Sequence, residues 1–356
     1  MTDQLRAGLL GAGFMGSVHA HAIRAAGATI TAVSASTPER SAQAASEVGA
    51  RRAVASADDL IHADDVDVVH VCTPNALHAR QALAALEAGK HVVCEKPLAT
   101  TEAEARQLAD AARDSSAITA VPFVYRFYPS VREARARIAA GEAGALRLIH
   151  GSYLQDWMAP AGAGNWRSDA SLGGASRAFA DIGIHWCDLI EFTTGHRIDR
   201  LTASTAATPS SDADGEDAAV LLFETDRGAA GSAVISQVSQ GRKNRLWFSV
   251  DGETAAYSFN QEQPDTLWVG GESHNQVLHR GSASEGPDAA RYSALPSGHP
   301  QGYQDCFNAF VRDTYAAIGN DAPDGLPTFD DGLRAAALTQ AVLESADTKT
   351  WVEVPR

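Results

Sequence analysis

Three side chains of the sequence have the types and the spacing needed for acid–base chemistry on a hydroxyl group. Asp181 and His185 are four residues apart, so on a helix both lie on one face and can contact the same ligand. Lys96 follows a short apolar run that predicts a strand, and ligands of open α/β sheets gather at strand carboxyl ends. Oxidation of a carbinol requires a base for the hydroxyl proton and a group that stabilises the developing alkoxide. A histidine suits the first task and a lysine the second.

Each of these residues also has a structural interpretation. A lysine before a proline is usually a surface residue at a strand end, Asp181 could cap a helix, and His185 could be a hydrogen-bonded core histidine. Their occurrence in one chain with a glycine-rich motif favours the catalytic interpretation. We predict His185 as the base, and Lys96 remains the alternative because desolvation can make a lysine basic at neutral pH.

The glycine-rich motif is Gly11-Ala12-Gly13-Phe14-Met15-Gly16, which follows the first predicted strand directly and opens a helix. In such a motif the first glycine permits a tight turn, the second lets the backbone approach a pyrophosphate, and the third permits close packing of helix against strand. The N–H groups and the dipole at the start of the helix favour an anion. A turn without a ligand is the alternative, but the strand-to-helix position predicts a dinucleotide site.

The end of the second predicted strand departs from the usual NAD pattern. An acidic residue about 20 positions after the glycine motif normally holds the adenosine ribose hydroxyls, but here the chain reads Ser34-Ala35-Ser36-Thr37-Pro38-Glu39-Arg40. Ser36 and Thr37 offer hydroxyls where a carboxylate would repel a 2′-phosphate, and Arg40 follows one turn later. Arg40 as an ordinary solvated helix residue is the alternative. We predict NAD(P) as the cofactor, with NADP favoured over NAD.

The order of the predicted elements indicates an α/β protein with two domains, since 356 residues are long for one core. Up to residue 121, β-rich runs alternate with Ala-rich helical runs, which is typical of a doubly wound parallel sheet. The predicted strands are 5–10, 28–33, 66–72, 91–94 and 117–121, and the predicted helices are 76–88 and 101–113. Residues 1–121 are therefore expected to form a Rossmann dinucleotide-binding domain.

After Pro122 the strands recur without a regular helix between each pair, which predicts a mostly antiparallel sheet. The predicted strands are 147–154, 218–224, 229–237, 246–250, 255–259 and 266–269, the predicted helical segments are 130–140, 178–195, 303–318 and 330–345, and 270–300 is expected to be a loop. Residues 122–356 are expected to bind substrate and to form the oligomer contact. Segments 218–224 and 229–237 carry apolar residues at both odd and even positions, as expected when neither face of the sheet is fully exposed to solvent. We therefore predict a homodimer or homotetramer through this sheet.

Composition excludes several other classes of protein. The formal net charge is −15 and the acidic residues are scattered, which argues against a nucleic-acid partner. Cys72, Cys94, Cys187 and Cys306 are far apart without CxxC spacing, so we expect buried thiols in a reducing compartment. No clustered ligands predict a metal site. The chain shows no signal peptide and no apolar stretch long enough to span a bilayer, so a cytoplasmic location is expected.

A further set of motifs resembles one known family. Cys94-Glu95-Lys96-Pro97-Leu98-Ala99, Thr73-Pro74-Asn75 with His78, the glycine motif, and the segment from Asp181 to His185 together resemble the Gfo/Idh/MocA family of glucose-fructose oxidoreductase and inositol dehydrogenase relatives. The resemblance runs from residue 5 to 354, and Glu-Lys-Pro is its most specific element. It implies a Rossmann domain followed by an α/β domain with a large, open, mostly antiparallel sheet that often mediates oligomerisation.

The resemblance also implies roles for single residues. Lys96 would touch both the nicotinamide ribose and the reacting hydroxyl, and Asp181 and His185 would complete the catalytic group. Glu95 and Pro97 would position the lysine. The dinucleotide would be lined by Thr73, Pro74, Asn75 and His78, and the substrate would be contacted by side chains that fall where relatives place such groups: Tyr125, Arg126, Trp166 and Arg167.

The predicted function is that of an NAD(P)-dependent dehydrogenase or reductase. It would transfer a hydride between the nicotinamide and a carbinol of a sugar, polyol, inositol or related cyclic substrate. Two alternatives stay open: a redox-neutral, NAD-dependent glycosidase or lyase of the same family, and a non-catalytic nucleotide sensor. Retention of Lys96, Asp181 and His185 disfavours the sensor.

Overall fold

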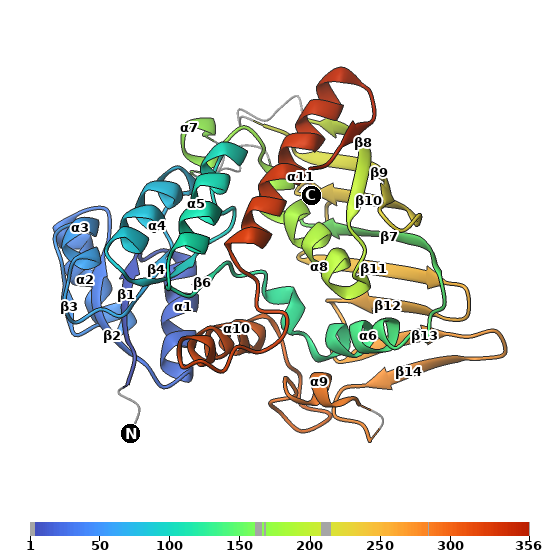
Figure 1. The fold of residues 1–356 in the computed structure, drawn as a ribbon, viewed down its shortest axis with the longest axis horizontal. Coiled ribbons are helices and arrows are strands. Elements are labelled where there is room, and N and C mark those ends of the chain that lie inside the picture. Colours follow the sequence, from blue (N-terminus) through green and yellow to red (C-terminus); the bar gives the residue numbers. More distant parts are fainter. Residues whose placement is uncertain (1–3, 161–165, 167–168, 208–214, 284, 356) are drawn as a thin grey trace. The chain divides into compact units, whose positions relative to one another are not determined.

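The computed structural model describes residues 4–160, 166, 169–207, 215–283 and 285–355, and the chain divides into two compact units (Figure 1). One unit comprises Met1–Val124 and Gln304–Ala336, and the other Tyr125–Tyr303 and Ala337–Arg356. This division differs from the single boundary expected at residue 121, because the chain returns to the first unit with α10 (Tyr303–Ile318). The hydroxyl of Tyr315 in α10 lies 2.8 Å from Nε2 of His70, a residue of the first unit's sheet.

The first unit contains a six-stranded sheet in which all neighbouring strands are parallel. The strand order β3-β2-β1-β4-β5-β6 reverses between β1 and β4, the position where open α/β sheets bind ligands. The strands are β1 (Arg6–Leu10), β2 (Thr29–Ser34), β3 (Arg52–Ala53), β4 (Val68–Val71), β5 (His91–Cys94) and β6 (Thr119–Ala120). The predicted doubly wound sheet is confirmed. The sequence did not reveal β3, because its two exposed residues carry no apolar pattern.

Helices connect these strands, and several begin at a side chain that caps them. Thr37, Ser56 and Thr101 each accept a hydrogen bond from a backbone N–H of the first helical turn. The helices are α1 (Phe14–Ala25), α2 (Pro38–Val48), α3 (Ala57–Ile61), η1 (Asn75–Leu77), α4 (His78–Glu87) and α5 (Glu102–Asp114), and α11 (Phe329–Thr348) begins in this unit. Among the described residues, no helix combines the length and the apolar composition needed to cross a bilayer.

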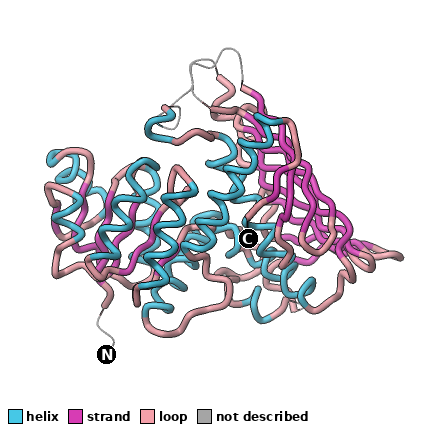
Figure 2. Tube along the Cα trace, turned by 45° about the horizontal axis from the view of Figure 1, so that its top comes forward, coloured by secondary structure: helices cyan, strands magenta, loops and turns pink. Residues whose placement is uncertain are grey.

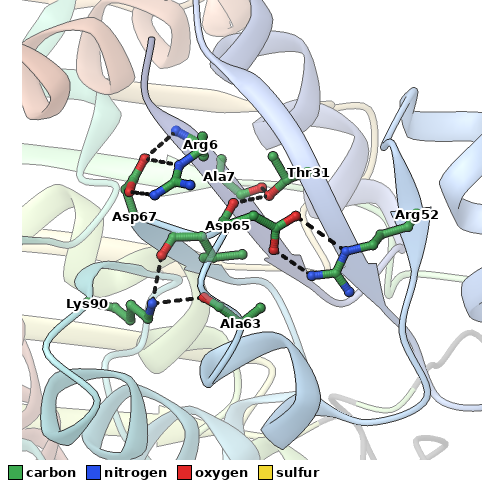
Figure 3. Close-up of polar contacts among 9 residues, drawn as sticks. Arg6, Ala7, Thr31, Arg52, Ala63, Asp65, Asp67 and Lys90 are labelled. Atoms are coloured by element: carbon green, nitrogen blue, oxygen red, sulfur yellow. Dashed lines mark hydrogen bonds and ion pairs between the residues drawn. The ribbon is translucent and has the colours of Figure 1, made fainter. Parts of the chain in front are cut away.

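Side-chain contacts join neighbouring segments at the edge of the sheet where its strands begin (Figure 3). Arg6 pairs with Asp67 at 2.6 Å, and its hydrogen bond holds the pKa of that carboxyl below the usual value. Nζ of Lys90 donates to two backbone carbonyls, those of Ala63 and Val66. These contacts are structural. A ligand is expected at the opposite edge of the sheet, where the strands end.

The second unit contains a nine-stranded sheet with the order β14-β13-β12-β11-β7-β10-β9-β8-β15. Only β7 and β10 are parallel, and all other pairs are antiparallel. The strands are β7 (Leu146–Leu154), β8 (Ile198–Ala206), β9 (Ala218–Thr225), β10 (Ala230–Ser236), β11 (Arg245–Gly252), β12 (Ala256–Asn260), β13 (Thr266–Gly270), β14 (Asn275–His279) and β15 (Val352–Glu353). This confirms the expected mostly antiparallel sheet.

The expectation of a loop over residues 270–300 is wrong in part. That segment contains β14 and α9 (Pro287–Ala290). β14 pairs only with β13 and is largely exposed, so its sequence lacks the alternation of buried and exposed residues that predicts a strand.

The helices of the second unit lie on one face of its sheet (Figure 2). They are η2 (Val124–Phe127), α6 (Pro129–Ala139), α7 (Ala170–Gly173), η4 (Phe179–Gly183), α8 (Ile184–Thr194) and α9, with the last part of α11. The opposite face carries large apolar side chains that are exposed: Leu148, Val220, Leu222, Val234, Trp268 and Val277. The strand register places them on the same face, since Val234 stands opposite Val220 and Trp268 opposite Val277.

Candidate active site

The glycine motif forms a tight turn that leaves room for a ligand above its middle residue. Gly11 has φ 91°, and a Cβ there would lie 2.5 Å from the carbonyl oxygen of Cys72. A Cβ on Gly16 would lie 2.5 Å from the carbonyl oxygen of Gly11. At Gly13, the residue before α1, a Cβ would meet nothing within 4 Å. The loop therefore fits a pyrophosphate, which the first N–H groups of α1 can bind.

The segment after β2 lies against this loop. The backbone carbonyl of Ser34 accepts a hydrogen bond from the N–H of Gly11. Ser36 and Thr37 are exposed, and Thr37 caps α2. One guanidinium nitrogen of Arg40 donates to the carbonyl of Ala12 at 3.1 Å, and another donates to the carboxylate of Glu47. Arg40 thus lies beside the glycine loop, where a group bound to an adenosine ribose could meet it.

His78 joins the segments that follow β4 and β5. Its Nδ1 lies 2.8 Å from the carbonyl oxygen of Pro97 and its Nε2 lies 2.8 Å from that of Thr73. Burial lowers the pKa of His78 more than these two carbonyls raise it. The hydroxyl of Thr73 donates to Gln81, and Asn75 is buried at the start of η1. The predicted residues Thr73, Pro74, Asn75 and His78 therefore form one connected edge of the first unit.

Lys96 lies two residues after the end of β5 and is half-buried. Its backbone N–H donates to Oε2 of Glu95 at 3.1 Å. Glu95 is buried, and its own N–H donates to the carbonyl of Val71 at the end of β4. The lysine thus stands at the ligand-binding edge of the sheet, beside a fixed carboxylate.

In the second unit, Asp181 lies in the π-helical turn η4, and His185 lies in the first turn of α8. The carboxylate of Glu216 accepts the backbone N–H groups of Arg177 and Phe179 and so holds the start of this helical segment. A Cβ on Gly183 would lie 2.3 Å from the ring of Phe179, so close packing explains this glycine between the two predicted catalytic residues.

The structure brings Asp181 and His185 to one group of polar and aromatic side chains. The ring of His185 packs edge-on against that of Tyr125, with centroids 5.1 Å apart, and lies 6.5 Å from that of Tyr153. Burial raises the pKa of Tyr153 well above its usual value, and the charge of Asp181 contributes to this shift. Oδ2 of Asp181 accepts a hydrogen bond from Gln237 at 2.8 Å.

The same group contains residues that the sequence did not single out. The hydroxyl of Tyr153 hydrogen-bonds to that of Tyr125 and to Oδ1 of Asn244, which also accepts from Gln155 at 2.8 Å. Trp157 donates to Gln155. Tyr153 and Gln155 lie where β7 ends, and Gln237 follows β10. The signal that could have revealed them is the run of polar and aromatic residues at these strand ends.

Other predicted site residues are placed differently. The guanidinium of Arg126 pairs with both carboxylate oxygens of Asp188 and stacks over Phe192 at 5.0 Å, and both of these partners belong to the second unit. Trp166 is half-buried, and Arg167 lies outside the described residues. All four cysteines are free thiols. Among the residues that the structure describes, no cluster of three or more ligating side chains could hold a metal ion.

A doubly wound sheet with a glycine loop at its reversal point is the architecture of dinucleotide-binding oxidoreductases. Comparison with known protein families agrees with this class. Residues 5–123 match the oxidoreductase family with an NAD-binding Rossmann fold, and residues 131–258 match the Gfo/Idh/MocA C-terminal domain. The chain belongs to the Gfo/Idh/MocA family of oxidoreductases, which confirms the resemblance of its motifs.

Two relatives match over nearly their whole length. The levoglucosan dehydrogenase of Pseudarthrobacter phenanthrenivorans is 32% identical, with 99% of each chain covered. Inositol 2-dehydrogenase 2 of Saccharopolyspora erythraea is 30% identical, covering 98% of this chain and 94% of its own. A solved structure of levoglucosan dehydrogenase with NADH and L-sorbose superposes with a TM-score of 0.93 at 30% identity, with 99% of each chain covered. The chain is therefore an NAD(P)-dependent oxidoreductase.

Proposed function

We propose that this protein is a dehydrogenase or reductase of a sugar, polyol, inositol or related cyclic carbinol. The observation that carries the proposal is the position of Lys96 beside buried Glu95 at the ligand-binding edge of the first sheet. Relatives named for their activity on levoglucosan, inositol and D-xylose support the substrate class. All four cysteines are free, which supports a reducing, cytoplasmic location.

The catalytic residues in this proposal are Lys96, Asp181 and His185. The nicotinamide, when bound by the first unit, accepts or returns the hydride. His185 takes the proton from the substrate hydroxyl, and the Lys96 ammonium stabilises the oxygen as negative charge develops on it. Asp181, whose carboxylate accepts a hydrogen bond from Gln237, completes the proposed catalytic group.

The substrate-binding part of the proposal rests on the group around His185. Hydroxyl and amide groups of Tyr125, Tyr153, Gln155 and Asn244 suit a ligand with many hydroxyls, and the ring of Trp157 offers an apolar face. Trp166 remains a proposed contact. Initial rates with a panel of roughly fifty sugars and polyols, each with both nucleotides, test the substrate class. No activity with any member of the panel would contradict it.

NADP is the proposed cofactor, in preference to NAD. No carboxylate stands at residues 34–38, and Arg40 already lies beside the glycine loop, within reach of a 2′-phosphate. Arg40→Ala is expected to lower kcat/KM for NADP by about 10-fold and to leave that for NAD nearly unchanged, because a charged hydrogen bond to the phosphate is lost. Ala35→Asp should invert the preference. Steady-state kinetics with both nucleotides measure these effects.

Glu47 provides a second test of the cofactor proposal. Its carboxylate shares the Arg40 guanidinium, so Glu47→Gln should free that guanidinium and raise kcat/KM for NADP by a few-fold. If wild-type protein prefers NAD and Arg40→Ala changes neither nucleotide, the NADP proposal fails.

A homodimer or homotetramer through the second sheet is the proposed assembly. The six exposed apolar side chains from Leu148 to Val277 share one face of the sheet. Light scattering at micromolar concentration should give a multiple of the 37.4 kDa chain mass. The double variant V220D/L222D should dissociate the assembly, because it buries charge in the contact.

Gln107→Glu is the control for this experiment, since it adds a negative charge on the exposed side of α5 in the first unit. It should leave the assembly intact. A wild-type particle with the mass of one chain would rule out the oligomer.

A further inference from the structure

Four buried polar side chains of the first unit form a continuous hydrogen-bonded chain that ends at Glu95. The hydroxyl of Tyr315 lies 2.8 Å from Nε2 of His70, and Nδ1 of His70 lies 2.8 Å from Nδ1 of His19. Nε2 of His19 lies 3.1 Å from Oε1 of Glu95. The other oxygen of Glu95 accepts the backbone N–H of Lys96. The chain therefore connects α10, β4 and α1 with the residue that carries the proposed catalytic ammonium.

The chemistry of Glu95 and His70 determines which ring nitrogens carry protons. An ionised carboxylate only accepts hydrogen bonds, so Nε2 of His19 must carry a proton and donate it to Glu95. Burial and the charge of His19 hold the pKa of His70 well below its usual value, so His70 is neutral and has one donor and one acceptor nitrogen. Burial would raise the pKa of Glu95, but the hydrogen bond and charge of His19, together with the charges of Lys96 and His78, lower it below the usual value. Glu95 is thus held as a carboxylate.

Such a chain is costly if it only fills the core. His19 and His70 are fully buried, and apolar side chains of similar volume would pack there without the need to satisfy ring nitrogens. The ring of His19 already packs against that of Phe307 with centroids 4.7 Å apart, so the surroundings suit an apolar residue. The polar contact that distinguishes histidine at this position is the one to Glu95.

We propose that His19, supported by His70 and Tyr315, is a positioning residue that fixes the Glu95 carboxylate and, through it, the backbone of Lys96. This inference rests on the proposed function of Lys96. His19 does not touch substrate or nucleotide in this account. Loss of its contact to Glu95 misplaces the ammonium and lowers kcat, while the glycine loop continues to bind the dinucleotide.

Two substitutions at one position separate this role from simple packing. In His19→Gln the side-chain amide nitrogen can occupy the place of Nε2 and still donate to Glu95. In His19→Asn the amide reaches only the place of Nδ1, so it keeps a polar contact toward His70 and loses the one to Glu95. We expect His19→Asn to lower kcat by about 10-fold and His19→Gln to stay within about threefold of wild type. The dinucleotide Kd should stay within about twofold in both.

Tyr315→Phe removes the hydroxyl at the far end of the hydrogen-bonded chain and should lower kcat by no more than about twofold. The loss of kcat should therefore be smaller for this variant than for His19→Asn, whose side chain is next to Glu95. Nitrogen NMR of the histidine rings gives a readout that does not depend on turnover. It should show a proton on Nε2 of His19, and Glu95→Gln should shift that signal. Equal losses of kcat in His19→Asn and His19→Gln, or an unprotonated Nε2, would overturn the proposal.

If His19→Asn does not fold, Glu95→Gln tests the same contact. It keeps the side-chain volume at position 95 and removes the negative charge of the carboxylate that contacts His19. A Glu95→Gln variant with wild-type kcat would also overturn the inference. Failure of the proposed function is distinguishable: it would appear as full turnover in Lys96→Met, whatever the His19 variants do.

Discussion

Lys96→Met is expected to lower kcat by about 10²- to 10³-fold, because the charged group that stabilises the developing alkoxide is removed. Methionine keeps the length and much of the apolar stem of lysine. The dinucleotide Kd should change by no more than several-fold, since the proposed phosphate site, the glycine loop and the start of α1, does not include this side chain. Turnover rates and titration with the reduced dinucleotide measure the two effects separately.

Lys90→Met is the matched control for this variant. Lys90 lies just before β5, whereas Lys96 lies just after it. Among the described residues, the Lys90 ammonium donates to two backbone carbonyls at the edge where the strands begin (Figure 3). Its loss should lower the melting temperature and leave kcat near the wild-type value. Near wild-type kcat in Lys96→Met would contradict the catalytic role of that lysine.

His185→Ala is expected to lower kcat by about 10²- to 10⁴-fold in the oxidative direction, because the proton acceptor for the substrate hydroxyl is lost. An imidazole accepts a proton only in its neutral form, so activity of the wild type should fall as the pH decreases. In the variant this acidic limb should flatten, since no base has to lose a proton first. The pH dependence of kcat/KM measures the change.

His279→Ala provides the control, since this histidine is exposed in β14 and should not alter the profile. An acidic limb that persists unchanged in His185→Ala would identify Lys96 as the base, the alternative that the sequence left open.

Most of the first unit was predictable because most of its elements, though not β3, carry a local signal. Apolar strands, capped helices and the glycine motif follow one another at regular spacing, and the strand order of a doubly wound sheet then places Gly11, Thr73 and Lys96 on one edge. The return of α10 to this unit was not predictable. It depends on packing such as that of Tyr315 against His70, which are 245 residues apart.

The substrate side of the second unit was predictable only in part. The spacing of Asp181 and His185 and the family resemblance predict them as site residues, but Gln155 and Gln237 lie together because β7 and β10 form the single parallel pair of the described sheet. Periodicity does not encode such a pairing. Arg126 shows the same limit, since its neighbour Tyr125 contacts His185 while its own guanidinium pairs with Asp188.

The role inferred for His19 could not be predicted from the sequence. Its two hydrogen-bond partners are His70 in β4 and Glu95 after β5, and His70 in turn contacts Tyr315 in α10. Only the folded sheet brings these residues together.

The central claim is that this chain performs net hydride transfer between a dissociable nicotinamide and a cyclic carbinol. The most direct measurement is the stoichiometry of reduced nucleotide formed per substrate consumed, by absorbance and product analysis, with dialysed protein and excess NADP or NAD. The account predicts one reduced nucleotide for each substrate oxidised, formed about 10²- to 10³-fold more slowly with Lys96→Met. Consumption of substrate without accumulation of reduced nucleotide would contradict it and would identify a redox-neutral enzyme.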